Sequence, residues 1–523
     1  MYFRILLPLK LNWTPTYSSD EELMRGMRVR VSFSHKEYIG IILSSNATVD
    51  GFSPEKILPV LQTDTGLPPV SEQELSLWVF IAGYYACTLG EVYKAAYPQL
   101  KTNSELVLAK KAPDSKRSAS ENTGATGHKP EVFLNPDRTE HYIQKISKCL
   151  ENNGEALVLV PETALADTLR KRLKTTFKDK LRIFNSNQTA AHRRETAMLL
   201  RSGSPIVVLG TRSSIFLPFS NLRLVIIDEE QDSSYKQSEP NPRYNGRDTA
   251  VVLAGIHGAE VILGTSTPSF ETLHNIYTGK YLASGSETCY SSCSPEIIDL
   301  QKEQRKNGVN AAFSIILSKQ INGCEGSICL VRGWEKEDEL QATVEAFYPG
   351  KDICIRTAAA VRNGNGHYDL LAVLQADAFF DSSDFRSDEK ALQLLSRLSS
   401  KADRTIIQTF KAEHPVFAVL SGNADIGTMM EEREDFNLPP YSRLMDIVLN
   451  DSNPKRLEMF ENILSGSFPT AVKIREEGRT RLRLTMPKGR DAGSFKVSAS
   501  LKIKQIEESY RYFGHIHLDV DPY

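Results

Sequence analysis

A cluster of four polar residues, Asp228-Glu229-Glu230-Gln231, directly follows the aliphatic run Leu224–Ile227. In nucleotide hydrolases, a carboxylate at such a position holds Mg²⁺ and the next one orients the attacking water. Two acidic residues at this point would equally suit the start of a helix, where they accept hydrogen bonds from backbone amides. The residue types therefore allow phosphoryl-transfer chemistry by Asp228 and Glu229 and leave a structural role open.

Three apolar runs of strand length must position this cluster. They are Ile206–Leu209, Leu224–Ile227 and Val261–Leu263, and each ends in small or acidic polar residues. Runs of this kind are typical of parallel strands buried on both faces. The carboxyl ends of such strands are where α/β sheets place their chemistry, so we expect the polar residues to meet at one sheet edge.

The wider order of segments adds a family resemblance. GTRSSIF, DEEQDSSYKQ, PRYNGRD and LGTSTPSFET follow one another between residues 210 and 272. This order resembles motifs Ib, II, the aromatic-rich loop and motif III of the PriA family of superfamily 2 DNA helicases, which act in bacterial replication restart. The resemblance implies an α/β fold with two RecA-like helicase lobes built on parallel sheets. A small β-rich DNA-binding domain would precede the lobes, and an α+β domain would follow them.

Length and composition fit this architecture. The chain has 523 residues, of which 41% are hydrophobic and 24% charged, and this length suggests roughly three or four domains. A formal charge of −2 excludes a polycation, so nucleic-acid binding would depend on local basic patches. No run approaches the about 20 apolar residues of a membrane span. We expect a cytoplasmic protein that contacts no membrane, and its seven cysteines suit reduced thiols there.

The resemblance divides the chain into five parts. Residues 1–101 are similar to the family's 3′-DNA-binding domain, residues 128–278 to helicase lobe 1, residues 279–415 to lobe 2 and residues 416–523 to the C-terminal domain. Residues 102–127 are rich in Ser, Thr, Lys and Gly and lack aromatics, which is a flexible linker composition. The family carries a winged-helix domain there, and about 25 polar residues are too few to bury its core.

The first part contains candidate DNA contacts. Strands are predicted at Tyr2–Leu7, Gly26–Phe33 and Glu37–Leu43, followed by a helix that contains Trp78. In the family, a pocket in this domain captures the 3′ end of a DNA strand. By resemblance, Thr16 and Tyr17 lie near the acidic residue of that pocket, and Ser34 stands where a glycine is usual.

The family's phosphate loop, GxxxxGKT, aligns with a segment that lacks its chemistry. Glycines let successive backbone amides turn towards the phosphates, and the lysine adds a positive charge. Here no glycine lies between Leu134 and Tyr142, Pro136 lacks an amide hydrogen, and Asp137 adds a negative charge. Arg138 and Thr139 stand at the Lys-Thr positions as remnants of nucleotide binding. The sequence predicts that productive ATP binding is lost or strongly impaired.

The opposite half of the family's ATP site is altered as well. Residues 393–404 align with motif VI, QLLTQVAGRAGR, which supplies an arginine finger to the γ-phosphate. Lys401 and Arg404 keep the cationic positions, and Ser400 and Asp403 replace both glycines. A lysine cannot give the planar bidentate contact of an arginine. Asp228, Glu229 and Arg404 are therefore predicted as remnant catalytic residues, with Lys401 as a remnant nucleotide ligand.

Further DNA contacts are predicted around the aromatic-rich loop, Asp232–Asp248. Alternating aromatic and cationic side chains suit base stacking and phosphate binding, although a loop packed by its own tyrosines is an open alternative. Gln231, Asn245 and Gly246 differ from the family's residues in this region, so the loop's coupling to hydrolysis is expected to be damaged. The candidate DNA-binding side chains are Arg212, Tyr235, Lys236, Arg243, Tyr244 and Arg247.

No metal site is predicted in lobe 2. The family inserts a zinc module there with repeated CxxC pairs. This chain has only Cys289/Cys293 and Cys324/Cys329, with three and four intervening residues, which do not suit tight zinc knuckles. We expect ordinary thiols and no structural zinc.

Three functions remain open from the sequence. The first is a PriA-like replication-restart protein that binds forked or single-stranded DNA and promotes primosome assembly, with its motor silent. Single-strand-binding protein and other primosome proteins would be its partners, by resemblance. The second is an active ATP-dependent 3′-to-5′ DNA helicase with an atypical phosphate loop, which would need ATP and Mg²⁺. The third is a scaffold that no longer touches DNA.

Overall fold

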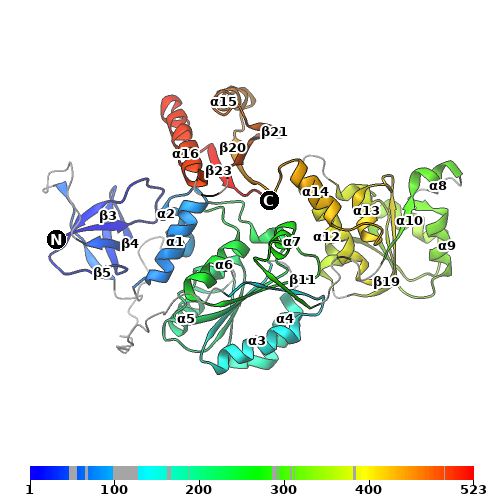
Figure 1. The fold of residues 1–523 in the computed structure, drawn as a ribbon, viewed down its shortest axis with the longest axis horizontal. Coiled ribbons are helices and arrows are strands. Elements are labelled where there is room, and N and C mark those ends of the chain that lie inside the picture. Colours follow the sequence, from blue (N-terminus) through cyan, green and yellow to red (C-terminus); the bar gives the residue numbers. More distant parts are fainter. Residues whose placement is uncertain are drawn as a thin grey trace.

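Four larger β-sheets organise the chain (Figure 1). The computed structural model describes residues 1–45, 56–64, 69–97, 128–161, 166–185, 188–285, 290, 294–306, 309–310, 312–364, 366–380, 384–487, 489 and 491–523. The linker predicted at 102–127 lies outside these ranges, as do Cys289 and Cys293. No helix among the described residues is long and apolar enough to cross a membrane.

The first sheet is antiparallel, with the strand order β2-β1-β4-β3-β5. Its strands are β1 (Tyr2–Leu6), β2 (Thr16–Ser18), β3 (Arg28–Phe33), β4 (Lys36–Ser45) and β5 (Gln62–Asp64), and helices α1 (Glu72–Tyr84) and α2 (Leu89–Ala96) follow. Ser34 and His35 form the turn between β3 and β4, with φ of 49° and 62°. Leu6 and Ile41 join the apolar cluster of α1, so this helix covers one side of the sheet.

The second sheet is parallel and forms helicase lobe 1, in the order β12-β6-β11-β10-β7-β9-β8. Helices α5 (Ala190–Arg201) and α6 (Gly246–His257) contribute to the core on one face, and α3 (Thr139–Glu151) and α4 (Ala166–Phe177) on the other. The three predicted strands are confirmed in β9, β10 and β11. The strands are β6 (Glu131–Leu134), β7 (Glu155–Leu159), β8 (Leu181–Phe184), β9 (Val207–Gly210), β10 (Leu222–Asp228), β11 (Glu260–Thr265) and β12 (Leu282–Gly285).

The third sheet is also parallel and forms lobe 2, in the order β13-β19-β18-β16-β17. Its strands are β13 (Glu296–Asp299), β16 (Ile328–Arg332), β17 (Ile353–Thr357), β18 (Tyr368–Val373) and β19 (Ala402–Thr409). Two short strands, β14 (Val309–Asn310) and β15 (Phe313–Ser314), pair beside it. Its helices are α8 (Leu300–Lys306), α9 (Ile315–Gly323), α10 (Glu337–Phe347), α11 (Ala358–Asn363), α12 (Ser387–Ser399), α13 (Pro415–Leu420) and α14 (Gly427–Asp435).

The last sheet is antiparallel, in the order β21-β22-β20-β23. It contains β20 (Arg443–Asn450), β21 (Val472–Glu476), β22 (Arg479–Met486) and β23 (Ile516–Val520), with α15 (Pro454–Ser467) and α16 (Asp491–Tyr510). Figure 1 shows this unit above lobe 1, with the chain's C-terminus between it and the two lobes. Its core residues belong to the same apolar cluster as those of α1, α6 and lobe 1.

Two elements cross the lobe boundaries that the sequence predicted. Strand β12 pairs with β6, so the sheet of lobe 1 extends to Gly285, beyond residue 278. Residues 416–430, from α13 and α14, pack into the apolar core of lobe 2, beyond residue 415. Both differences arise from tertiary contacts: a strand pairs with a sheet edge, and apolar helix faces pack into a core. The sequence pattern does not show which sheet or core an element joins.

Gly26 gives a test of the first sheet. Its φ is 86°, and a Cβ there would lie 2.2 Å from the Val70 carbonyl oxygen. Gly26→Ala should therefore lower the free energy of unfolding by about 2–4 kcal/mol, from backbone strain plus the clash. Gly279→Ala is the control, because its φ is 69° with no atom within 4 Å of the added Cβ, so it should cost about 1 kcal/mol. Urea denaturation measures both variants, and equal losses would contradict the prediction.

Candidate functional site

Three neighbouring strands bring the polar clusters of lobe 1 to one edge. Strands β6, β11 and β10 are adjacent and parallel, so Asn135, Thr265 and Asp228 lie at the same end of the sheet, as the sequence predicted. Asp228 is the last residue of β10, and Glu229 follows with a φ of 51°. A non-glycine residue in this left-handed region costs about 1–3 kcal/mol, which is typical of functional sites.

Arg138 joins the two predicted catalytic carboxylates. Its Nε donates to Asp228 Oδ1 at 2.9 Å, its second terminal nitrogen donates to Glu229 Oε1, and its Nη1 donates to the Asn135 carbonyl at 2.7 Å. The side chain is only 8% exposed. Burial alone would lower the pKa of Arg138, but Asp228 and Glu229 hold it well above the usual value. The guanidinium is thus a permanent cation between the carboxylates, held by charge-assisted hydrogen bonds.

A second arginine reaches the same carboxylate from lobe 2. Arg397 of α12 donates from Nη1 to Glu229 Oε2 at 2.8 Å. Burial would raise the pKa of Glu229, but Arg138 and then Arg397 outweigh it and lower the pKa to about 2. The sequence did not single out Arg397, although it replaces a glutamine of the aligned motif VI. Each oxygen of Glu229 is therefore neutralised by an arginine from a different lobe.

Backbone amides at the start of α3 already donate to side chains of the protein itself. The Asn135 Oδ1 accepts from the Asp137 amide at 2.9 Å, and Asp137 Oδ1 accepts from the Thr139 amide at 3.4 Å. An amide at a helix start favours a negative group, and here the chain's own Asp137 provides it. Thr139 is the first residue of this helix.

Tyr142 completes the cluster and was missed by the sequence reading. Its hydroxyl donates to Asp228 Oδ1 at 2.8 Å. Gly264 makes this approach possible, because a Cβ there would lie 1.5 Å from the tyrosine oxygen. The signal available in the sequence was the glycine near the end of a buried strand, which marks a close contact.

The arrangement does not fit a Mg²⁺–nucleotide. The cation would have to displace Arg138 from Asp228 and Glu229, and the phosphates would have to displace Asp137 from the start of α3. No glycine-lined nest of amides stands in its place. Among the described residues, no group of three or more His, Cys, Asp or Glu side chains is arranged to hold a metal ion.

The two cationic residues aligned with motif VI, Lys401 and Arg404, donate hydrogen bonds to other groups. Lys401 donates from Nζ to the Gly364 carbonyl at 2.9 Å, and burial, followed by repulsion from Arg397, lowers its pKa. Arg404 lies on β19 and donates to Gln320 Oε1 of α9 at 2.6 Å. The predicted finger role of Arg404 is not supported, because α12 ends at Ser399 and the chain enters a strand at Ala402.

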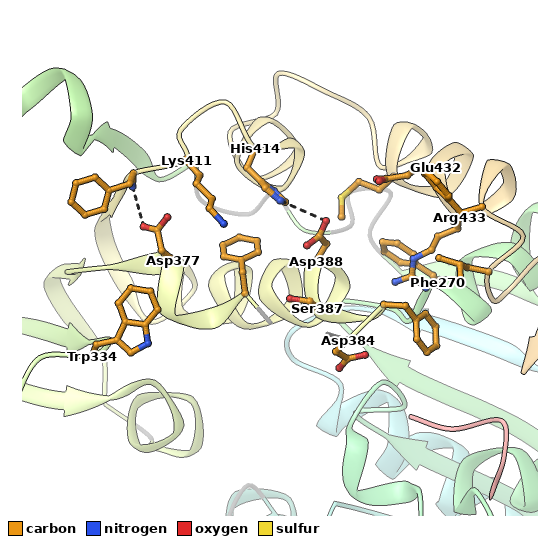
Figure 2. A pocket seen from close by; sticks show the side chains of 16 residues that line it. Phe270, Trp334, Asp377, Asp384, Ser387, Asp388, Lys411, His414, Glu432 and Arg433 are labelled. Atoms are coloured by element: carbon orange, nitrogen blue, oxygen red, sulfur yellow. Dashed lines mark hydrogen bonds and ion pairs between the residues drawn. The ribbon is translucent and has the colours of Figure 1, made fainter. Parts of the chain in front are cut away.

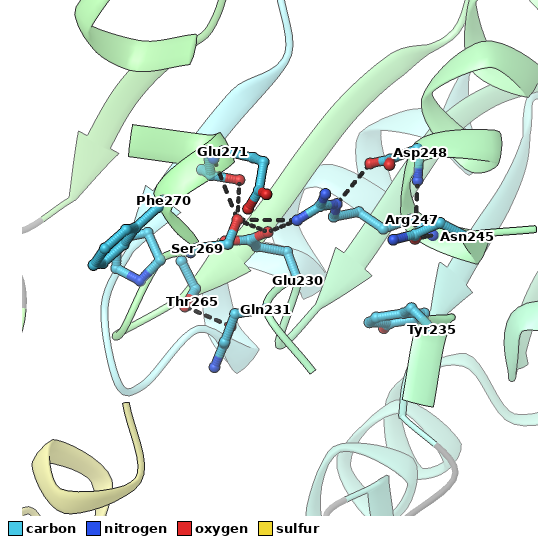
Figure 3. A network of polar contacts seen from close by, with 12 residues as sticks. Glu230, Gln231, Tyr235, Asn245, Arg247, Asp248, Thr265, Ser269, Phe270 and Glu271 are labelled. Atoms are coloured by element: carbon cyan, nitrogen blue, oxygen red, sulfur yellow. Dashed lines mark hydrogen bonds and ion pairs between the residues drawn. The ribbon is translucent and has the colours of Figure 1, made fainter. Parts of the chain in front are cut away.

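Glu230 and Arg247 form a buried structural pair (Figure 3). Glu230 is 1% exposed and accepts from Arg247 Nη1 at 2.9 Å and from the Ser269 amide at 2.7 Å. Helix α6 begins beside this pair, where Asn245 Oδ1 accepts from the Arg247 amide at 3.0 Å. Arg247, predicted to contact DNA, is instead an internal link between the ends of β10 and α6.

Gln231 connects the carboxylate cluster to the end of β11. Its Nε2 donates to Glu229 Oε2 at 2.8 Å, and its Oε1 accepts from Thr265 Oγ1 at 2.8 Å. Its backbone carbonyl accepts from the Tyr523 hydroxyl at 2.5 Å. The C-terminal unit therefore contacts the same cluster.

The aromatic-rich loop is packed inside the protein. Tyr235 is 2% exposed and donates to the Asp228 carbonyl at 2.6 Å, while Tyr244 packs edge-on against Phe216. The cations are engaged as well: Lys236 with the Val520 carbonyl at 2.7 Å, Arg243 with the Ser238 carbonyl at 2.6 Å, and Arg212 with the Ser234 carbonyl at 2.6 Å. The predicted stacking surface is not formed in this structure, because β23 and the loop's own carbonyls cover these groups.

Of the two candidate DNA-binding residues in the N-terminal domain, one is buried and the other is partly exposed. Tyr17 lies in the core of the first sheet, 2% exposed, and donates to the Ser32 carbonyl at 2.9 Å. Burial raises its pKa to about 12. Thr16, partly exposed, pairs with Arg4 at the sheet edge. Tyr17 is thus a core residue in this structure, and its contact with DNA stays a prediction.

A groove that the sequence did not predict lies at the carboxyl ends of β16, β18 and β19 (Figure 2). Its volume is about 610 Å³, and Trp334 on its rim is 65% exposed. Phe380, Phe410 and Lys411 line the same end. The other lining residues are Phe270, Asp377, Asp384, Phe385, Ser387, Asp388, His414, Met429, Glu432, Arg433, Phe436 and Leu438.

Three carboxylates of the groove have partners within the protein. Asp377 accepts from the Phe410 amide at 3.0 Å, Asp384 pairs with Lys390 at 2.8 Å, and Asp388 lies 3.7 Å from His414. Each of these three carboxylates is therefore engaged by a neighbouring group of the protein. Lys411 is exposed, and its side chain points into the groove (Figure 2).

Comparison with known proteins found matching family models, relatives and solved structures. Residues 4–98 match the family model of a 3′ DNA-binding domain of PriA, and residues 139–276 match the DEAD/DEAH box helicase model. The chain is 25% identical to the replication restart protein PriA of Rickettsia conorii over 99% of both chains. It is 34% identical to PriA of Helicobacter pylori over 52% of this chain and 44% of that one. A solved structure of RecG bound to a three-way DNA junction is similar over 60% of this chain, with 13% identity and a TM-score of 0.37.

The chain has two lobes built on parallel sheets, and an arginine of the second lobe contacts the polar edge of the first. This arrangement defines a protein of helicase fold. An antiparallel DNA-binding unit precedes the lobes and an antiparallel C-terminal sheet follows them. The chain belongs to the PriA replication restart protein family.

Removing the guanidinium of Arg138 should destabilise lobe 1. In Arg138→Met, Asp228 and Glu229 would lose their shared cation in a buried site, which should cost about 3–5 kcal/mol. Arg172→Met is the matched control, because Arg172 pairs with Glu140 in solvent, where ion pairs contribute at most about 1 kcal/mol. Urea unfolding compares the two variants. A loss in Arg138→Met no larger than in the control would contradict the role assigned to Arg138.

Proposed function

We propose that this protein is a replication-restart factor that binds forked or single-stranded DNA without ATP-driven unwinding. The observation that carries the proposal is the Arg138 guanidinium bonded to both Asp228 and Glu229. These are the carboxylates that Mg²⁺ and the attacking water would need. A site already neutralised by its own side chain has little affinity left for a metal–nucleotide complex.

Contacts between the lobes support the same proposal. Besides Arg397–Glu229, Arg386 of lobe 2 donates to Glu271 of lobe 1 at 2.6 Å, and the Phe270 amide donates to Glu389 at 2.9 Å. Phe270 and Leu273 of helix α7 (Phe270–Tyr277) also enter the apolar core of lobe 2. Opening the lobes would expose this apolar core to water and break the polar contacts between the lobes. A helicase motor needs such opening in every cycle.

The proposed DNA contacts are the N-terminal domain and the groove of lobe 2. The N-terminal domain matches a 3′ DNA-binding model. The groove is lined by Lys411 and by several aromatic residues, among them Trp334, Phe380 and Phe410. Aromatic rings beside a cation suit single-stranded DNA, with bases stacked on the rings and a phosphate near the ammonium.

Single-strand-binding protein and other primosome proteins are proposed as partners, from the family relationship.

An active helicase is the second candidate, because Asp228 and Glu229 are both retained at the sheet edge. ATP hydrolysis measured with and without forked DNA separates the two. Under our proposal, the wild-type rate matches that of Glu229→Gln and does not rise when DNA is added. DNA-stimulated turnover that Glu229→Gln abolishes would establish the active helicase.

The groove gives a separate prediction for DNA binding. Trp334→Ala should weaken binding of a fluorescent single-stranded oligonucleotide about 5- to 150-fold, the equivalent of about 1–3 kcal/mol for a stacked base. Lys411→Ala should weaken binding and reduce its salt dependence, because one phosphate contact is lost. Tyr277→Ala is the control, since Tyr277 is exposed on lobe 1. Fluorescence anisotropy across salt concentrations measures the affinity of all three variants. If neither groove variant changes the affinity, the groove does not bind DNA.

A further inference from the structure

Two cysteines face each other across neighbouring strands of lobe 2. Cys329 of β16 and Cys354 of β17 are partners in the parallel register, and both are free thiols. Neighbouring strands lie about 4.8 Å apart. That separation falls within the roughly 4.4–6.8 Å between Cα atoms that a disulfide spans.

Both side chains point to the same face of the sheet. Cys329 is fully buried in the apolar cluster under α11 and α12, and Cys354 and Tyr368 pack against that cluster. Strand β17 is the last strand of its sheet, and Cys354 is partly exposed there. The pair thus consists of one accessible sulfur and one enclosed sulfur.

The surroundings of the pair favour a thiolate at Cys354. The pKa of Cys354 is lowered to about 6, mainly by a hydrogen bond from the Cys329 thiol, which outweighs burial; the Tyr368 hydroxyl and Arg356 contribute to the same lowering. The pKa of Cys329 is raised by its hydrogen bond to Cys354 and by burial. The thiolate is the reactive form towards oxidants, so the accessible sulfur is also the activated one.

We propose that Cys354 and Cys329 form an oxidation site that hydrogen peroxide converts to a disulfide. The Cys354 thiolate attacks one peroxide oxygen, so that an S–O bond forms, the O–O bond breaks, and hydroxide leaves and takes up a proton as water. The Cys329 sulfur, deprotonated as it reacts, then attacks the Cys354 sulfenic acid. The S–S bond forms, the S–O bond breaks, and a second water leaves. Two thiols are oxidised and one peroxide is reduced. The site is independent of the nucleotide cluster and of the proposed function.

Hydrogen peroxide treatment of the full chain, followed by peptide mass spectrometry, tests the proposal. In the wild type, the expected product is a peptide pair joined through Cys329 and Cys354, about 2 Da lighter than the reduced peptides together. Cys329→Ser should stop the reaction at the first step and leave a sulfenic acid on Cys354 that dimedone labels. Cys354→Ser should leave Cys329 reduced. Cys149→Ser is the control, because burial raises the pKa of the Cys149 thiol to about 12, and it should form the same product as the wild type.

The variants Cys329→Ser and Cys354→Ser test the first oxidation step by itself, whatever the geometry of the disulfide in the sheet. Dimedone labelling of Cys354 in Cys329→Ser, at a rate at least tenfold above that of Cys149, supports the assignment of the attacking sulfur. A wild-type product joined through other cysteines, or Cys354 labelling no faster than Cys149, overturns the proposal.

Discussion

The guanidinium of Arg138 is the interaction on which the lobe 1 site depends. Asp228 and Glu229 lie together at the end of β10, and Glu229 adopts a left-handed backbone conformation there. Two carboxylates so close and so buried repel each other unless a cation lies between them. Arg138 provides that cation from the same chain, at 8% exposure, and Arg397 adds another from lobe 2. Charge neutrality of the site is thereby satisfied without metal or nucleotide.

This internal pairing has consequences beyond lobe 1. Because Arg397 belongs to α12, the charge balance of Glu229 depends on lobe 2 remaining against lobe 1. Gln231 extends the cluster to β11 and to Tyr523. The C-terminal sheet, through Val520 and Lys236, covers the loop that the sequence suggested for base stacking. One network of buried polar groups thus joins both lobes and the C-terminal unit into a common packing arrangement.

The DNA-binding surface that we propose consequently lies away from the aromatic-rich loop. Tyr235 and Tyr244 fill the interior, where their rings contribute packing. The groove of lobe 2 offers exposed Trp334 beside Lys411 at the carboxyl ends of three strands, which is where parallel sheets commonly bind ligands. Strand order, and not the linear spacing of aromatic residues, creates this surface.

The sequence alone determined the elements and much of the family relationship. Aliphatic runs such as Leu224–Ile227 specify buried parallel strands because only such runs can be covered on both faces. The absence of glycine before Tyr142 was also visible, and with it the loss of the phosphate loop. What replaced that loop was decided by tertiary structure. Arg138 and Arg397 are 259 positions apart in the chain, and their common contact with Glu229 depends on how two lobes dock. The burial of the tyrosines in the aromatic-rich loop was likewise decided by tertiary structure. It depends on which segments, such as β23, pack over the loop, and the sequence does not show this.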